Sequence, residues 1–303
     1  MLGPLLFVIF INDIVDAASH NIVKLFADDL KSYVTGNDLG SKVNFITSAN
    51  ELFQWANLWQ LPVAFNKSSW GIIHTGNNPN TELSFGDFEL AKVDEVKDLG
   101  VKFNYKLDFS SHIDDVVAKA KQRLFLLYKC IISRDPDTLI RGFKTYVLPI
   151  LDYNSQIWSP HKICDILRIE SVQRNFLKKL KGYGSLSYND RLIKSDLCSL
   201  ELRRLRSDLV LCFKIVHNLI PLNQKSFFTF DTTSRTRGNM YKIKLTFAKS
   251  KARFNFFASR VVNIWNSLPN IVVCSENIFE FKKRICVIDF SKFLILQCDR
   301  VER

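Results

Sequence analysis

The spacing of apolar residues changes near Ser110, and this change most constrains the fold of the chain. From this serine onward apolar side chains recur every three or four residues, the period of an amphipathic helix. Ser110 or Ser111 can cap the first such helix, and Asp114 and Asp115 fall in its first turn, where carboxylates favour the helix dipole. The expected buried stripe of this helix is Ile113, Val116, Val117, Ala120, Leu124 and Leu127.

Three further segments have the same period, at residues 138–148, 165–180 and 200–219. The second of them has one apolar face, made by Ile166, Ile169, Val172, Phe176 and Leu180. The spacing therefore predicts a helical bundle over residues 113–220. Residues 221–303 show no clear period, and no Gly/Ser-rich linker marks a boundary before them.

The first stretch, residues 1–112, mixes helical and β-like patterns. Residues 42–59 carry apolar side chains three and four apart, which predicts an amphipathic helix that ends before Leu61-Pro62. Strand candidates follow at residues 70–74, 83–90 and 96–103, with a turn signal at Gly86-Asp87 inside the second. We therefore expect an α+β chain in which a short antiparallel sheet with helices (1–112) precedes a mainly α-helical region (113–220) and a mixed region (221–303).

The chain is strongly basic, with a formal net charge of +12 over 303 residues. A summed field of this sign concentrates polyanions at the surface, which favours nucleic acid first and anionic membrane second. No uninterrupted apolar run reaches the roughly 20 residues of a spanning helix, so we expect no membrane partner. The early apolar run LGPLLFVIFI has no basic residue before it and no persuasive cleavage site after it, so we interpret it as core and not as a signal peptide.

The seven cysteines are widely spaced and form no CxxC or CxxxC pair. An odd number of isolated cysteines argues against a disulfide framework and against a zinc knuckle. We therefore expect reduced, buried thiols in an intracellular protein, nuclear or cytoplasmic. The seven positions are Cys130, Cys164, Cys198, Cys212, Cys274, Cys286 and Cys298.

Two adjacent carboxylates, Asp28 and Asp29, stand between two apolar runs in LFADDLKSYV. Successive side chains of a strand point to opposite faces, so both can face one metal ion only where a turn intervenes. Magnesium takes one or two protein carboxylates plus substrate phosphates, and polymerases use two such ions, so a polymerase site needs a further acid from a neighbouring strand. Taken alone, the pair is more typical of a solvated hairpin turn.

The segments around this pair occur in a recognisable order. MLGPLLFVIFINDI precedes LFADD, and WQLPVAFNKSSWGIIHTG and DLGVKFNYKLDFSSHI come next. LPILDYNSQIWSP, SYNDRLIKSDLCSLELRRLRSDLVLCFKIVHNLI and FFASRVVNIWNSLP follow. In this order the segments resemble the reverse transcriptase of non-LTR retrotransposons. The resemblance implies a partial polymerase palm, a helical thumb and a basic C-terminal extension.

The resemblance also implies roles for single residues, because the family's Phe-Ala-Asp-Asp hairpin carries catalytic metal ligands. Asp28 would be the principal Mg2+ ligand and Asp29 a weaker or indirect partner. Phe26 and Ala27 would shape the turn. Lys67 would lie near the triphosphate, where an ammonium can neutralise or protonate the leaving pyrophosphate. The alternative for Lys67 is an ordinary exposed lysine.

Two more segments receive roles from the same resemblance. Gly3 and Pro4 would lie near the incoming nucleotide, while Leu99, Gly100 and Val101 would hold the primer end as part of a primer-grip-like hairpin. The composition of Leu99-Gly100-Val101 fits a plain buried strand with a bulge equally well. An intact relative would extend the 3′-hydroxyl of a DNA primer on an RNA template, using deoxynucleoside triphosphates and Mg2+.

The fingers and the first catalytic strand of the family pattern lie outside this sequence. The family's palm has another aspartate on a strand before the Gly-Pro-Leu-Leu-Phe segment, and this sequence starts at that segment. We therefore expect a truncated enzyme with little or no polymerase activity from this chain alone. The rival hypothesis is a non-catalytic nucleic-acid-binding remnant, and a third is a product with no selected role. The remaining acids nearby, Asp13, Asp16 and Asp38, are expected to be solvated.

Residues 235–260 combine cations with aromatic rings and contain no acid. This mixture suits a nucleic-acid groove, in which cations contact phosphates and rings stack on bases. The alternative is that the rings are core and the cations only solvate the surface. The cations are Arg235, Arg237, Lys242, Lys244, Lys249, Lys251, Arg253 and Arg260, and the rings are Tyr241, Phe247, Phe254, Phe256 and Phe257.

Two details of the basic region lead to separate expectations. Phe256, Phe257 and Trp265 are expected to be core whichever interpretation of the cations holds. Arg203, Arg204 and Arg206 form another basic cluster on a predicted helix. Asp208 or Glu201 could pair with them in place of a phosphate.

Overall fold

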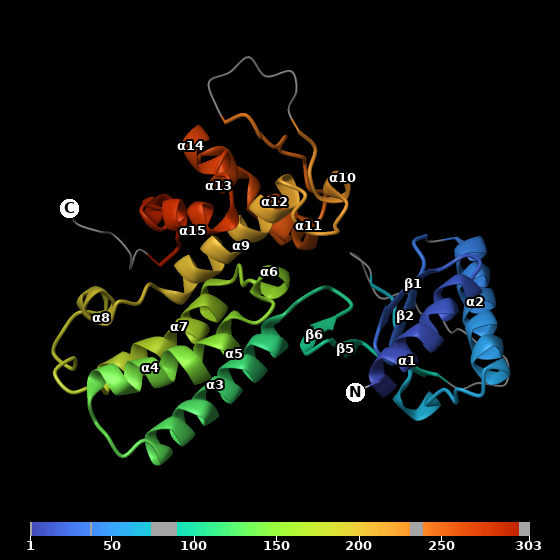
Figure 1. Cartoon of the computed structure of the whole chain (residues 1–303), viewed down its shortest axis with the longest axis horizontal. Helices are drawn as coiled ribbons and strands as arrows, with labels where there is room; N and C mark the ends of the chain where they lie inside the picture. The colour runs from blue at the N-terminus through green and yellow to red at the C-terminus, as the bar shows by residue number, and fades with distance from the viewer. Residues whose placement is uncertain (1, 37, 74–89, 231–238, 297–303) are drawn as a thin grey trace. The chain divides into compact units, whose positions relative to one another are not determined.

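The computed structural model describes residues 2–36, 38–73, 90–230 and 239–296 (Figure 1). The chain forms two compact units, the first ending at Glu95 and the second beginning at Val96. It is mostly helical with short two-stranded sheets, which confirms the expected α+β class. The boundaries expected at residues 112 and 220 separate the palm-like, thumb-like and C-terminal regions, and they remain predictions. No helix among the described residues is long and apolar enough to cross a membrane.

The first unit is built on a β-hairpin and one long helix. Strands β1 and β2 pair antiparallel, while β3 and β4 form a two-residue parallel pair. The helix expected at residues 42–59 is confirmed as α2, which buries Leu52 against the hairpin's Val23. The bounds are α1 (Leu2–Ile11), η1 (Asn12–Ala17), β1 (Ile22–Phe26), β2 (Asp29–Tyr33), α2 (Leu39–Leu58), η2 (Phe65–Lys67), β3 (Ser69–Trp70) and β4 (Ala91–Lys92).

Two strand predictions in this unit have different outcomes. The strand expected at residues 70–74 is shortened to β3, which ends at Trp70. The Trp70 indole is buried and donates to the carbonyl oxygen of Leu90 at 3.2 Å, so this short pair is fixed by a side chain as well as by its backbone. The hairpin expected at residues 83–90 lies outside the described residues, apart from Leu90.

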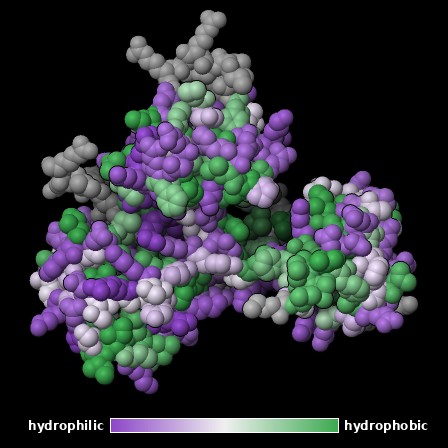
Figure 2. Space-filling view, in the orientation of Figure 1, coloured by the Kyte–Doolittle hydropathy of each residue, from purple (hydrophilic) through white to green (hydrophobic). Residues whose placement is uncertain are grey.

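The prediction that the first apolar run is core is wrong. In α1 only Ile11 is buried, and the hydrophobic colour gathers over this helix in Figure 2. The cause is that every side of α1 is apolar, whereas a helix at the edge of a small unit can bury one face only. The exposed large side chains of α1 are Leu2, Leu5, Leu6, Val8, Ile9 and Phe10.

Strands β5 (Glu95–Asp98) and β6 (Val101–Asn104) form a two-stranded sheet where the second unit begins. The single strand expected at residues 96–103 is therefore wrong. Leu99 and Gly100 both have a positive φ, of 44° and 84°, and together they make a two-residue hairpin turn. This is the backbone of a primed turn, which leaves Leu99 and Gly100 exposed and not inside a buried strand.

Helices α3 to α8 enclose one hydrophobic core. The stripe predicted for α3 is buried at all six positions, and so are the five residues predicted for the helix at 165–180, of which Leu180 lies just beyond the end of α7. The cap prediction is wrong, because Ser110 is the first residue of α3 and Asp108 accepts its N–H at 3.0 Å and its hydroxyl at 2.9 Å. The bounds are α3 (Ser110–Cys130), α4 (Pro136–Tyr146), α5 (Leu148–Asp152), α6 (Ser155–Trp158), α7 (Ile163–Lys178) and α8 (Tyr188–Lys194).

A second core of the same unit lies between α9 and the short helices that follow it. Its largest buried side chains are Phe213 on α9, Trp265 and Phe281. The bounds are α9 (Leu200–Val216), α10 (Gln224–Phe227), α11 (Lys251–Asn255), α12 (Phe257–Arg260), α13 (Val262–Asn266), α14 (Asn270–Val273), α15 (Ile278–Cys286) and η3 (Ser291–Phe293).

The expectation that the cysteines are buried holds for few of them. Six cysteines lie in the described part of the chain, and none of these six forms a disulfide. Cys212 is buried and Cys198 half-buried, but the other four are exposed. The reason is their position at helix ends, where the chain reaches the surface. Cys164 lies in the first turn of α7, while Cys130, Cys274 and Cys286 lie at the ends of α3, α14 and α15.

Candidate functional site

Asp28 and Asp29 lie at the closed end of the β1–β2 hairpin. Phe26 is paired with Asp29 across the hairpin, so Ala27 and Asp28 form a two-residue turn. Ala27 has a φ of 52°, which a non-glycine residue adopts at a cost of about 1 kcal/mol or more. Asp28 belongs to the turn and Asp29 begins the strand, so the alternation of side chains along a strand does not force the two carboxylates onto opposite faces.

The closed end of the hairpin is open to solvent. Phe26, Ala27, Asp28 and Asp29 are all exposed, and the Phe26 side chain keeps 61% of its area accessible. Mg2+ commonly takes one or two protein carboxylates and completes its shell with water and phosphate oxygens, so the acid pair fits one such ion. Within the described ranges no three His, Cys, Asp or Glu side chains come together as a metal site. A second metal ion would need a further carboxylate.

Lys67 is exposed at the end of η2, in the same unit as the hairpin. No ion pair joins it to Asp28 or Asp29 in the part of the chain that the structure describes. Gly3 and Pro4 are exposed in the first turn of α1. A Cβ added to Gly3 would meet no described atom within 4 Å, so packing within the fold gives no reason for a glycine there.

The three other acids of this unit lie on the surface as expected. Asp13 and Asp16 are exposed in η1. Asp38 is exposed too, and it caps α2 by accepting the Ser41 N–H at 3.0 Å. Hydrogen bonds from the Ser41 hydroxyl and N–H lower the pKa of Asp38. This acid therefore has a structural role at the start of α2.

The segment expected to hold a primer end belongs to the second unit. The Tyr153 hydroxyl donates to the carbonyl oxygen of Leu99 at 3.0 Å, and a Cβ on Gly100 would lie 3.4 Å from the Tyr153 ring. Val101 is buried at the start of β6. Tyr153 therefore fixes the turn from a helical part of the same unit, and the turn itself faces solvent.

The basic region is described only in part, since Arg235 and Arg237 lie outside the described residues. Phe247 and Phe254 have exposed rings, which suits base stacking. Phe257 and Trp265 are buried, as predicted. Phe256 contradicts the core prediction because its ring is exposed at the surface, 5.5 Å from the Arg253 guanidinium. Lys244, Lys249, Lys251 and Arg253 are exposed and Lys242 is half-buried.

Two arginines of the basic clusters form ion pairs within the fold. Arg260 pairs with the buried carboxylate of Asp208 at 2.7 Å, so it is not available to phosphate. Arg203 pairs with Asp152, against the expectation of Asp208 or Glu201. Asp152 was missed because it lies 51 positions away in the sequence and only folding brings it to Arg203.

Sequence reasoning also missed a basic surface on α3 and α7. The sequence does carry a signal for this surface, since residues 116–134 and 171–189 contain no Asp or Glu. Nine cations of these runs are exposed, and the structure brings α3 and α7 side by side. We call these nine residues, which lie on more than one side of the two helices and in the segments after them, the α3–α7 basic surface. They are Lys119, Lys121, Arg123, Lys129, Arg134, Arg174, Lys178, Lys179 and Lys181.

Comparisons with known proteins give a distant relationship. No family model matches the chain, and no solved structure matches it. Over 129 residues, or 42% of its length, the chain is 24% identical to an uncharacterized protein of Caenorhabditis elegans and covers 63% of that protein. Over 190 residues, or 60% of its length, it is 22% identical to the probable RNA-directed DNA polymerase from transposon X-element of Drosophila melanogaster, of which it covers 21%. The chain is therefore distantly similar to a reverse transcriptase of a transposable element.

Proposed function

We propose that the chain is a palm and thumb portion of a reverse transcriptase of the non-LTR retrotransposon kind. The observation that carries this proposal is the Ala27-Asp28 turn, which presents two adjacent carboxylates at the end of an exposed hairpin. The distant similarity to a transposon RNA-directed DNA polymerase supports it. In this proposal residues 1–112 contribute the palm, residues 113–220 the thumb, and residues 221–303 a basic extension.

Asp28 and Asp29 would hold Mg2+ in this proposal. The ion would supply positive charge to a triphosphate and to the attacking primer hydroxyl. Asp28 is the better-placed ligand because it lies in the turn, where its carboxylate is free of the strand pairing that orients Asp29. The exposed Phe26 would provide an apolar edge beside the acids. Lys67 would contribute an ammonium toward the triphosphate, and Gly3 would let a nucleotide approach the backbone of α1.

These 303 residues are proposed to bind primer–template without extending it. Two-metal chemistry needs a carboxylate beyond the hairpin pair, and the described residues supply none close enough to form a three-acid cluster. A missing electrostatic element of this kind typically costs about 3 kcal/mol or more of transition-state stabilisation. The further acid would have to come from a segment other than the described ones.

Two assays on the whole chain test the proposal. Binding to an RNA–DNA primer–template should weaken with salt, with a slope of log K against log salt near −5 if roughly six cations contact phosphate. No binding at low salt would overturn the proposal. Primer extension with Mg2+ and all four deoxynucleoside triphosphates should give no product. Product that disappears in Asp28→Asn would instead show a complete enzyme and overturn the claim of incompleteness.

A further inference from the structure

Helices α3 and α7 lie side by side and run in the same direction. At their starts, the Ser110 hydroxyl donates to Asp165 at 2.8 Å. At the far end of α3, the Tyr128 hydroxyl donates to the carbonyl oxygen of Phe176 at 3.4 Å. Since both helices begin at one end of the pair and finish at the other, their side chains meet along a continuous seam.

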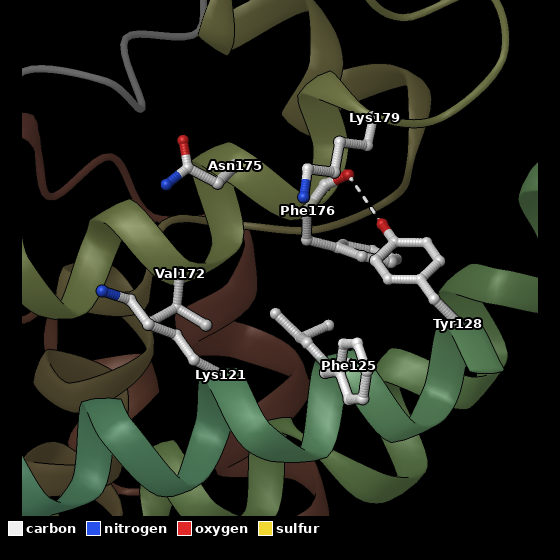
Figure 3. Close-up of a pocket in the computed structure, with 8 residues that line it drawn as sticks. Lys121, Phe125, Tyr128, Val172, Asn175, Phe176 and Lys179 are labelled. Atoms are coloured by element: carbon white, nitrogen blue, oxygen red, sulfur yellow. Dashed lines mark hydrogen bonds between the residues drawn. The ribbon is translucent and has the colours of Figure 1, made fainter.

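A groove of about 250 Å³ opens along the second half of this seam. Each side of the groove contributes residues at positions i, i+3, i+4 and i+7, and Figure 3 shows Val172 of α7 directed toward Lys121 of α3. The floor is apolar, since Leu124, Val172 and Phe176 are buried. The complete lining is Lys121, Leu124, Phe125 and Tyr128 from α3 with Val172, Asn175, Phe176 and Lys179 from α7.

The charges along the seam are separated by sign. At the starts of the helices acids and cations are paired, with Arg168 at 2.5 Å from Asp114 and 3.4 Å from Asp165. The lining of the groove includes two cations and no acid, and residues 116–134 and 171–189 contain no acid. Among described residues, none of the nine cations of the α3–α7 basic surface has a carboxylate within ion-pair distance. Charge complementarity therefore requires an anionic occupant.

The groove also offers an aromatic ring to its occupant. Phe125 lines the groove and is 67% exposed. Tyr128 lies one helical turn further along, and the Lys179 ammonium is 5.9 Å from the centre of its ring. Burial raises the pKa of Tyr128 to about 12, so its hydroxyl remains a donor at neutral pH. A ring next to unpaired cations is the combination that binds single-stranded nucleic acid.

We propose that this groove takes an unpaired nucleotide of a single-stranded RNA or DNA. The base stacks on Phe125, the flanking phosphates contact Lys121 and Lys179, and the Asn175 amide faces the base edge. The groove is smaller than the roughly 300–1,000 Å³ of a typical small-molecule pocket, which suits one unit of a longer polymer. A duplex would satisfy the cations but keep its stacked bases away from the Phe125 ring. This inference deepens the proposed function and rests on it for the class of partner.

Fluorescence anisotropy of the whole chain with a 12-nucleotide oligouridine and with a blunt 12-base-pair RNA duplex tests the proposal. Phe125→Ala should weaken binding of the single strand about tenfold and leave duplex binding within about twofold. Phe125→Tyr should restore single-strand binding because it keeps a ring. The control is Leu126→Ala, an exposed neighbour outside the groove that should change neither affinity. Circular dichroism should show the same helix content in all variants.

The two lysines are tested by the salt dependence of the same titration. Lys121→Gln combined with Lys179→Gln should make the single-strand slope less steep by about 1.4, since each phosphate contact on a single strand contributes roughly 0.7. The matched control combines Lys225→Gln with Lys292→Gln, which removes two exposed cations from elsewhere in the second unit. This control should leave the slope nearly unchanged.

Three outcomes would overturn the inference. If the Phe125 and lysine variants bind the single strand as well as the unmodified chain does, the groove is not the binding site. The proposed function would still stand in that case. Equal losses on the single strand and the duplex would assign the groove to duplex backbone and overturn the unpaired nucleotide. No binding of either probe by the unmodified chain at low salt would overturn both the groove and the proposed function.

Discussion

Arg260 and Asp208 form a bidentate ion pair inside the second unit. The Arg260 Nε and Nη2 atoms lie 2.7 and 2.9 Å from the two carboxylate oxygens of Asp208. The same guanidinium donates to the carbonyl oxygen of Gln156 at 2.7 Å. One arginine at the end of α12 therefore joins α9 and α6, and its contribution is to the fold and not to nucleic-acid binding.

Arg260→Ala should lower the free energy of unfolding of the second unit by about 3 kcal/mol or more. The reason is that the substitution leaves the Asp208 carboxylate buried without its partner. Arg253→Ala is the matched control, since Arg253 is exposed and nearby in sequence, and it should change stability by less than about 0.5 kcal/mol. Urea denaturation measures both. Equally small losses of unfolding free energy in the two variants would show that Arg260 is free at the surface.

Gly100→Ala should destabilise the second unit by about 1 kcal/mol or more. Gly100 has a φ of 84°, which an L side chain rarely adopts, so the added Cβ strains the backbone even though it would lie at a contact distance of 3.4 Å from the Tyr153 ring. Gly3→Ala serves as the contrasting variant because its Cβ would meet no described atom. It should leave stability unchanged or raise it slightly. Thermal denaturation compares the two variants. An unchanged melting temperature in Gly100→Ala would refute the assigned turn.

Acidification should destabilise the second unit through His112. This ring is buried, and its Nδ1 accepts the Lys102 N–H at 3.3 Å. Burial lowers the pKa of His112 below its ordinary value of 6.5, so the unfolded chain binds a proton more readily than the folded one. The stability that neutral His112 gives is present above pH 6.5 and is lost as the pH falls, by at most about 1.4 kcal/mol per pH unit.

His112→Gln should remove this pH dependence while keeping an acceptor for the Lys102 N–H. Denaturant titrations at pH 7.5 and 5.5 give the comparison. The control is His161→Gln at an exposed histidine, which should retain the pH dependence of the unmodified chain. A His112→Gln variant that loses as much stability on acidification as the unmodified chain would contradict the assignment.

The exposed face of α1 should promote self-association. Leu6 and Ile9 are exposed on neighbouring turns, and large exposed apolar patches mark association or aggregation surfaces. Replacing both with Gln should lower light scattering at equal protein concentration and change the stability of the first unit by less than about 0.5 kcal/mol. A loss of several kcal/mol would instead show that these side chains are core.

The sequence predicted those parts of the fold that depend on local period. The α3 stripe from Ile113 to Leu127 follows from three- and four-residue spacing alone, because one face of a long helix must be buried. The apolar pattern did not indicate the turn at Leu99 and Gly100, since a short hairpin and a single strand share the same apolar residues, and only the resemblance implied a hairpin in this segment. The partners of Arg203 and Arg260 were not predictable, because each lies about fifty positions away and depends on tertiary packing.

The candidate site was predictable to a different degree in each part. Asp28 and Asp29 could be identified as a hairpin end from LFADD, and the structure gives that hairpin. Their role toward a metal ion is a proposal that depends on the resemblance. The groove at Phe125 escaped prediction because its two walls lie some fifty residues apart, although the acid-free runs of α3 and α7 are plain in the sequence.

Iron-mediated backbone cleavage tests the central claim most directly. Fe2+ replaces Mg2+ at carboxylate sites, and with ascorbate and peroxide it cuts the backbone near the ion. In the presence of primer–template and deoxynucleoside triphosphate, we predict cleavage at residues 26–29 that excess Mg2+ suppresses. Asp28→Asn should abolish this cleavage, while Asp13→Asn, at another exposed acid of the first unit, should not. Cleavage at residues 26–29 that persists in Asp28→Asn, or its absence in the unmodified chain, would contradict the claim that Asp28 is a metal ligand.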